Sequence, residues 1–133
     1  MSNWFLPCNP KTFNVVDCLK ERDYFIWKQD NRMKKGDTVY AYIGNPYSEI
    51  KYRCIIAEAD IDPETVKEMG FQQIVSILDR SAKYMKLHME YEYPDGKCKL
   101  AELKAHGLST IQRQCRIFDD LLTFLTLMEG KTV

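Results

Sequence analysis

The residues best suited to chemistry are aromatic side chains that alternate with polar ones in three short segments. These segments are Trp4–Pro10, Tyr24–Lys28 and Lys35–Tyr42. Aromatic side chains on neighbouring strands stack on flat ligands, and a nucleotide base is the most common flat ligand in a cell. The same side chains also fill hydrophobic cores. The residue types therefore leave two interpretations open, a base-binding pocket or core packing.

Residues suited to catalysis are few and scattered. The two histidines, His88 and His106, have no nucleophile or base beside them. Asp60 and Asp62 are close enough in sequence to bind magnesium together, but Asp62 precedes a proline and suits a helix cap. The sequence contains no glycine-rich phosphate loop and no zinc-ligand spacing. We expect a protein that is not an enzyme and has no metal or cofactor.

The composition indicates one globular domain spanning residues 1–133. Hydrophobic residues make up 45% of the chain, charged residues 29%, and the formal net charge is zero. Binding to nucleic acid therefore requires a local basic patch together with contacts to bases. The five cysteines lie far apart, which indicates reduced thiols and a cytoplasmic location. We find no signal peptide and no run of roughly 18 apolar residues, so we expect no membrane association.

Hydrophobic periodicity and turn residues predict the elements that must position these side chains. Residues 83–93 alternate most regularly, and Asp62-Pro63-Glu64 is typical of a helix start. The predicted strands are Trp4–Cys8, Tyr24–Lys28, Thr38–Ile43, Ile50–Ile61 and Lys83–Tyr93. One predicted helix ends near Arg22, and another covers residues 116–128. Residues 62–82 form one helix or two short ones broken at Gly70, and residues 99–105 form a short strand or a helical turn. This order predicts an α+β fold, a small and mainly antiparallel β-barrel with helices packed outside.

The N-terminal half resembles the EVE domain, a member of the PUA-like superfamily that is related to YTH and ASCH domains. The resemblance covers residues 3–61. It rests on the opening Trp-Phe-Leu-Pro-Cys-Asn-Pro block, on Trp27 within a strand, on the Lys-Lys-Gly-Asp turn before residue 38, and on the Cys-Ile-Ile-Ala-Glu-Ala strand. The chain departs from the EVE pattern at residues 7–10 and 28–32, where the ligand of the family binds, so the identity of the ligand stays open.

The resemblance implies a non-catalytic module that recognises a modified base, methylated or hydroxymethylated, in DNA or RNA. Trp27 matches the aromatic residue of the pocket, and Asn9 matches a polar position that can bond to the edge of a base. The backbone of Lys28 lies beside the pocket, and Tyr42 and Trp4 are candidates for further walls. The resemblance also implies a possible nuclease partner.

A basic patch would supply the contacts to phosphates that such a module needs. The residues expected to contact the nucleic-acid backbone are Arg32, Lys34, Lys35, Lys51 and Arg53.

Two other functions remain open. An ASCH-like module for a small ligand or for RNA processing would need a polar cleft lined by lysine and acid near Asp37 or Asp60. A protein-interaction domain would expose the alternating face of residues 83–93, formed by Met85, Leu87, Met89, Tyr91 and Tyr93.

Overall fold

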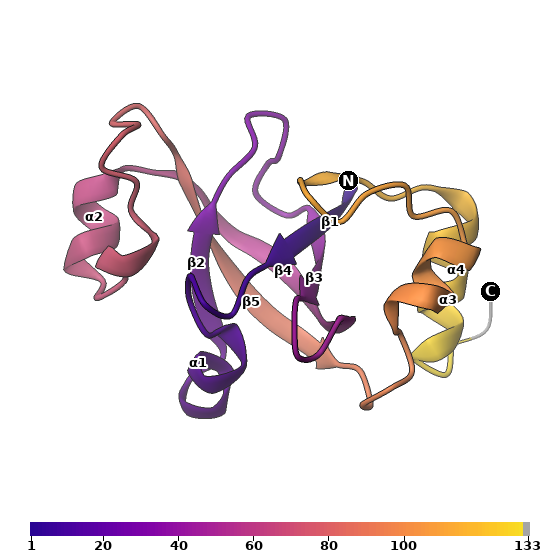
Figure 1. The fold of residues 1–133 in the computed structure, drawn as a ribbon. Helices are drawn as coiled ribbons and strands as arrows, with labels where there is room; N and C mark the ends of the chain where they lie inside the picture. The colour runs from indigo at the N-terminus through magenta and orange to yellow at the C-terminus, as the bar shows by residue number, and fades with distance from the viewer. Residues whose placement is uncertain (132–133) are drawn as a thin grey trace.

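One open, mixed sheet of six strands organises the protein, and the computed structural model describes residues 1–131 (Figure 1). The strands are β1 (Asn3–Cys8), β2 (Tyr24–Lys28), β3 (Thr38–Ile43), β4 (Glu49–Ile61), β5 (Tyr84–Glu92) and β6 (Cys115–Arg116). Their order in the sheet is β2-β5-β4-β3-β1-β6. The pair β1 and β3 is parallel, and the other neighbouring pairs are antiparallel. The prediction of an α+β fold with a mainly antiparallel sheet is confirmed. The expected closed barrel is not confirmed, because β2 and β6 remain the two unpaired edges of the sheet.

The helices are short, and two of them begin at side-chain caps. They are α1 (Val15–Glu21), α2 (Pro63–Glu68), the 3₁₀ turn η1 (Gln72–Ile74), α3 (Leu100–Ala105) and α4 (Asp119–Met128). The side chain of Asn14 accepts the backbone N–H of Asp17 at 3.0 Å, and Asp62 accepts that of Thr65 at 2.8 Å. None of the helices in residues 1–131 has the length and hydrophobicity that crossing a bilayer requires.

One of the two alternatives for residues 62–82 is confirmed, and one helix start needs correction. The helical segment is broken at Gly70, where a positive φ of 89° ends α2 after Glu68, and η1 follows it. The helix expected from Arg116 begins at Asp119 instead, because Cys115 and Arg116 pair with β1 as strand β6.

A hydrophobic core packs against each face of the sheet, because successive residues of a strand point to opposite faces. On β1, Trp4 and Leu6 join the core that also contains Val15 and Val16 of α1. Phe5, between them, joins the core formed with Leu103 of α3 and with Leu121 and Leu125 of α4. Figure 1 shows α1 and α2 at one end of the sheet and α3 and α4 at the other.

The alternating face of residues 83–93 is covered by these cores. Met85, Leu87 and Tyr93 are fully buried, and Met89 and Tyr91 are half-buried. The expectation that this face stays exposed for pairing with another chain is therefore wrong.

Candidate functional site

A cavity of about 820 Å³ lies between the end of β2 and the segment that leads into β6. Its size falls within the range of about 300–1,000 Å³ that is usual for small-molecule sites. It is lined by Pro7 of β1, by Trp27, Lys28, Gln29, Asp30 and Arg32, and by Gln112, Arg113, Gln114 and Cys115. The cavity thus occupies the gap between the two edges of the sheet, so the open sheet creates the space in which a ligand fits.

Trp27 is the aromatic residue of this cavity. It is half-buried on β2, and the ring of Phe25 meets it edge-on, with the centroids 6.2 Å apart and the planes at 80°. Pro7 and Cys115 add apolar surface to the lining. Burial raises the pKa of the Cys115 thiol, so the thiol is neutral at neutral pH and behaves as a small apolar group. Trp27 therefore offers indole surface to a flat ligand within a partly apolar cavity.

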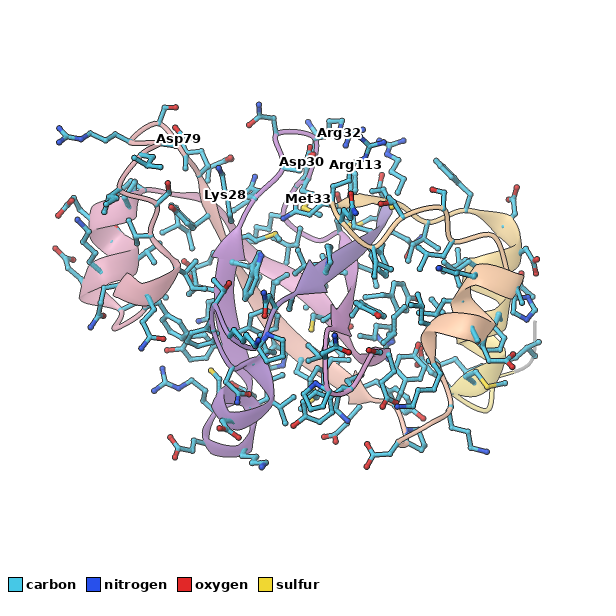
Figure 2. All side chains as sticks on the ribbon, in the orientation of Figure 1. Lys28, Asp30, Arg32, Met33, Asp79 and Arg113 are labelled. Atoms are coloured by element: carbon cyan, nitrogen blue, oxygen red, sulfur yellow. The ribbon has the colours of Figure 1, made fainter. Side chains whose placement is uncertain are left out.

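Positive charge predominates in the lining. The lining contains three basic side chains, Lys28, Arg32 and Arg113, and one carboxylate, Asp30, while Lys28 also pairs with Asp79 just outside it at 3.4 Å. The guanidinium of Arg32 bonds to both Asp30 oxygens, each at 3.0 Å, and these bonds hold the pKa of Asp30 below its usual value. Arg113 forms no ion pair within residues 1–131. Figure 2 shows Asp30, Arg32 and Arg113 close together near the top of the view, between the two ends of the molecule. The chain has no net charge, yet this cavity carries a local positive excess that favours phosphate.

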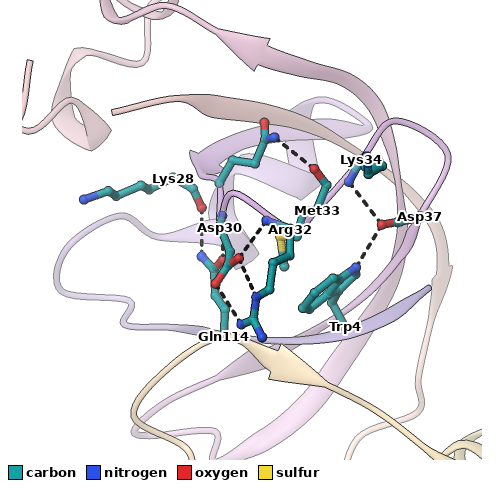
Figure 3. A network of polar contacts seen from close by, with 9 residues as sticks. Trp4, Lys28, Asp30, Arg32, Met33, Lys34, Asp37 and Gln114 are labelled. Atoms are coloured by element: carbon teal, nitrogen blue, oxygen red, sulfur yellow. Dashed lines mark hydrogen bonds and ion pairs between the residues drawn. The ribbon is translucent and has the colours of Figure 1, made fainter. Parts of the chain in front are cut away.

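The side chain of Gln114 spans the cavity between the two edges of the sheet (Figure 3). Its Nε2 donates to the backbone oxygen of Lys28 at 2.8 Å, and its Oε1 accepts the backbone N–H of Asp30 at 3.1 Å. Gln29, between these two residues, points the other way and donates its N–H to Lys83. The Lys28 oxygen and the Asp30 N–H therefore point outward from the free edge of β2, and the Gln114 side chain pairs with both groups.

Asp37 anchors the loop that carries Arg32. Its carboxylate accepts Trp4 Nε1–H at 2.9 Å and the backbone N–H of Lys34 at 3.1 Å (Figure 3). It also accepts the backbone N–H of Ser2 at 3.1 Å. Burial alone would raise the pKa of Asp37, but these hydrogen bonds outweigh burial and the pKa lies below its usual value. Gly36 precedes it with φ 92°, a conformation that glycine adopts most readily.

The two carboxylates expected in an ASCH-like cleft serve structural contacts instead. Asp37 is buried in the anchor just described. Asp60 pairs with the buried side chain of Gln29, whose Nε2 donates to Asp60 Oδ1 at 3.1 Å and whose Oε1 accepts the Asp60 N–H at 2.8 Å. Neither lines the 820 Å³ cavity.

The structure does not bring all the predicted pocket residues together. Trp27 and Lys28 share the cavity, whereas Asn9 and Tyr42 line a second one of about 530 Å³ on the other side of Pro7. The side chain of Asn9 accepts the N–H of Lys11 at 2.9 Å, and Tyr42 packs on Phe5.

Trp4 lies in the core and forms no wall of the cavity. It is fully buried, and the guanidinium carbons of Arg32 and Arg116 lie 5.3 and 5.2 Å from its ring centroid. Its role as a further wall of the pocket is therefore corrected to a structural one.

Only some residues of the predicted basic patch lie at or near the cavity. Arg32 lines the cavity, and Lys34 and Lys35 are exposed on the same loop. Lys51 is buried against Asp95, at 2.7 Å, with its ammonium over the ring of Tyr47.

Arg53 is held equally firmly by carboxylates, at 2.7 Å from Glu90 and 3.1 Å from Glu129. The expected backbone contacts of Lys51 and Arg53 are therefore corrected, because neutralising partners already occupy both side chains.

Sequence reasoning missed the segment from Gln112 to Cys115, which supplies one wall of the cavity. The only local signal is a polar and basic run without periodicity just before the terminal helix. Within residues 1–131 no cluster of His, Cys, Asp and Glu could hold a metal ion. All five cysteines are free thiols.

No protein-family model matches the sequence, and no curated protein matches it. Solved structures do match its fold over nearly the whole chain. Human THYN1 in complex with DNA containing 5-methylcytosine is similar with a TM-score of 0.68 and 16% identity, covering 100% of both chains. ASCH from Zymomonas mobilis is similar with a TM-score of 0.66 and 10% identity, covering 95% of this chain and 94% of that one.

A hypothetical protein from Leishmania major is also similar, with a TM-score of 0.70 and 14% identity, over 98% of this chain and 96% of that one. Identities this low establish a shared fold. The expected resemblance is confirmed at the level of the fold, which this chain shares with the ASCH and THYN1 structures.

Proposed function

We propose that this protein is a non-catalytic module that binds nucleic acid and reads a modified base, methylated or hydroxymethylated, in the cavity beside Trp27. The observation that carries this proposal is a half-buried tryptophan lining a cavity of about 820 Å³ with a positive lining. The shared fold with human THYN1, which was solved with DNA containing 5-methylcytosine, supports the same function.

The energetics are consistent with a base that leaves its stack. Removing a base from a duplex costs a few kcal/mol, and stacking on an aromatic side chain returns about 1–3 kcal/mol. Arg113 has no carboxylate partner within the described chain, and Lys34 and Lys35 are exposed nearby, so these residues are suited to contact phosphates. A methyl group buried against Trp27, Pro7 or Cys115 adds about 0.8 kcal/mol, which corresponds to about fourfold in affinity.

Fluorescence anisotropy with matched oligonucleotides tests this function. The set carries cytosine, 5-methylcytosine or 5-hydroxymethylcytosine at one position, in single and double strands of DNA and RNA. We expect about fourfold preference for the methylated base over the unmodified one. Trp27→Ala should weaken that binding by about 5- to 150-fold, and Trp27→Phe should restore part of it.

Phe118→Ala is the matched control, because Phe118 is 64% exposed and lies outside the cavity. It should leave the affinity unchanged. Equal affinity for modified and unmodified oligonucleotides, together with an unaffected Trp27→Ala variant, would overturn base reading at this cavity.

A second candidate is an ASCH-like module that acts on a small ligand or on RNA. It is supported by Lys28 and Asp30, which line both the main cavity and an adjacent one of about 510 Å³ that also includes Asp79. Mass spectrometry of modified nucleosides incubated with the protein distinguishes the two. A product that disappears in Lys28→Ala would favour this candidate over the reader.

A further inference from the structure

We propose that the Gln114 carboxamide occupies the place of the base edge, and that an entering base displaces it from Lys28 and Asp30. This inference rests on the proposed function, since it assigns the groups of that cavity that read the base. The geometry is a two-point contact from one amide to the free edge of β2, at 2.8 Å and 3.1 Å.

The chemistry of the carboxamide matches that of a base. An amide carries one N–H donor and one oxygen acceptor on the same carbon. The Watson–Crick edge of a cytosine or adenine likewise carries an amino donor beside a ring-nitrogen acceptor. The Lys28 oxygen and the Asp30 N–H, which together bind Gln114, can therefore accept from and donate to such an edge (Figure 3).

The position of Gln114 makes displacement feasible. Gln114 is half-buried, and its bond to the Lys28 oxygen lies in an exposed position where water competes. Gln114 is also separated from Lys28 by 86 residues and from Asp30 by 84, so the contact joins two distant segments across the cavity. Releasing the side chain opens the gap between the edges of the sheet and leaves β2 with one free acceptor and one free donor.

Competition between Gln114 and the base predicts an unusual result, in which removing a lining side chain strengthens binding. The net contribution of one neutral hydrogen bond corresponds to about fivefold in an equilibrium constant. Gln114→Ala should therefore bind the 5-methylcytosine oligonucleotide about 5- to 30-fold more tightly than the wild-type protein.

Gln73→Ala is the matched control. Gln73 carries the same carboxamide, is exposed on η1 and lies outside the cavity. It should leave the affinity unchanged, which separates displacement of the Gln114 amide from a general effect of removing a glutamine.

Nuclear magnetic resonance of the wild-type protein gives a second readout that does not depend on the folding of a variant. On saturation with the same oligonucleotide, the side-chain amide signals of Gln114 should shift while the Asp30 backbone amide stays protected from exchange. Unchanged Gln114 signals, or a Gln114→Ala variant that binds no more tightly than a wild-type protein that does bind, would overturn this inference alone. Absence of binding by the wild type and by every variant would instead overturn the proposed function, and this inference with it.

Discussion

Replacing Asp37 by alanine should destabilise the protein by about 3–5 kcal/mol. The carboxylate accepts three hydrogen bonds, one of them from the fully buried indole of Trp4. Hydrogen bonds to an ionised group contribute about 1.5–3 kcal/mol each, and a buried donor left without a partner costs about 1–3 kcal/mol. Water can reach the backbone N–H groups of Ser2 and Lys34, which are only partly buried, so the full sum is not expected.

Urea unfolding at neutral pH measures this loss, which is large against a usual total stability of about 5–15 kcal/mol. Asp62→Ala is the matched control, because Asp62 is an exposed helix cap whose removal costs about 0.5–2 kcal/mol. A loss for Asp37→Ala no larger than that of Asp62→Ala would refute the assignment of Asp37 as the anchor of the loop.

The lowered pKa of Asp37 gives the same prediction a pH dependence. The stabilisation is present above the pKa of the unfolded chain, which is about 3.9, and is lost as the pH falls through the lower pKa of the folded state. Asp37→Asn should therefore be less stable than wild type at pH 7, and the difference should shrink below about pH 4. Other carboxyls with lowered pKa values, such as Asp30 and Asp62, also make the stability depend on pH. They are present in both proteins, so the difference in stability between wild type and Asp37→Asn reports on Asp37 alone. A difference that stays constant down to pH 2 would contradict it.

Three further predictions concern the turn, the cavity and the second core. Gly36→Ala should lower the free energy of unfolding by about 1–2 kcal/mol, because a residue with a Cβ is strained at the φ of 92° found there. A melting temperature equal to that of wild type would contradict this backbone strain. Arg113→Ala should reduce the slope of log binding constant against log salt concentration by about 0.9 in magnitude, because one phosphate contact is lost. Lys104→Ala on α3 should leave that slope unchanged. Equal slopes for the two variants would show that Arg113 does not contact phosphate. Tyr93→Phe should cost about 1 kcal/mol in urea unfolding, because the hydroxyl bonds to Glu129 at 2.6 Å; an unaltered free energy would contradict that contribution.

The strands were predictable because their signal is local. Residues 83–93 alternate along the chain, and β5 forms there over Tyr84–Glu92. Strand β6 was missed, because two residues carry no periodicity and their pairing with β1 joins segments more than 100 residues apart. Whether the two edges of a sheet pair with each other depends on such distant contacts. The sequence therefore could not show whether the sheet closes into a barrel.

The residues of the site also differ in whether the sequence could reveal them. Trp27 and Lys28 were expected at the site only through the resemblance to the EVE domain, and both line the cavity. Gln114 was not expected, because its role exists only when the fold brings it to the edge of β2. Lys51 was misassigned because the sequence does not reveal that Asp95 lies 2.7 Å away and neutralises it.

The most direct test of base reading uses the two tryptophans of the chain as internal probes. Trp4 is fully buried with its Nε1–H bonded to Asp37, whereas Trp27 is half-buried at the cavity. In a heteronuclear correlation spectrum, titration with an oligonucleotide carrying 5-methylcytosine should shift the Trp27 indole N–H signal and leave the Trp4 signal in place. A Trp27 signal that stays unmoved when the oligonucleotide is fully bound would contradict the account.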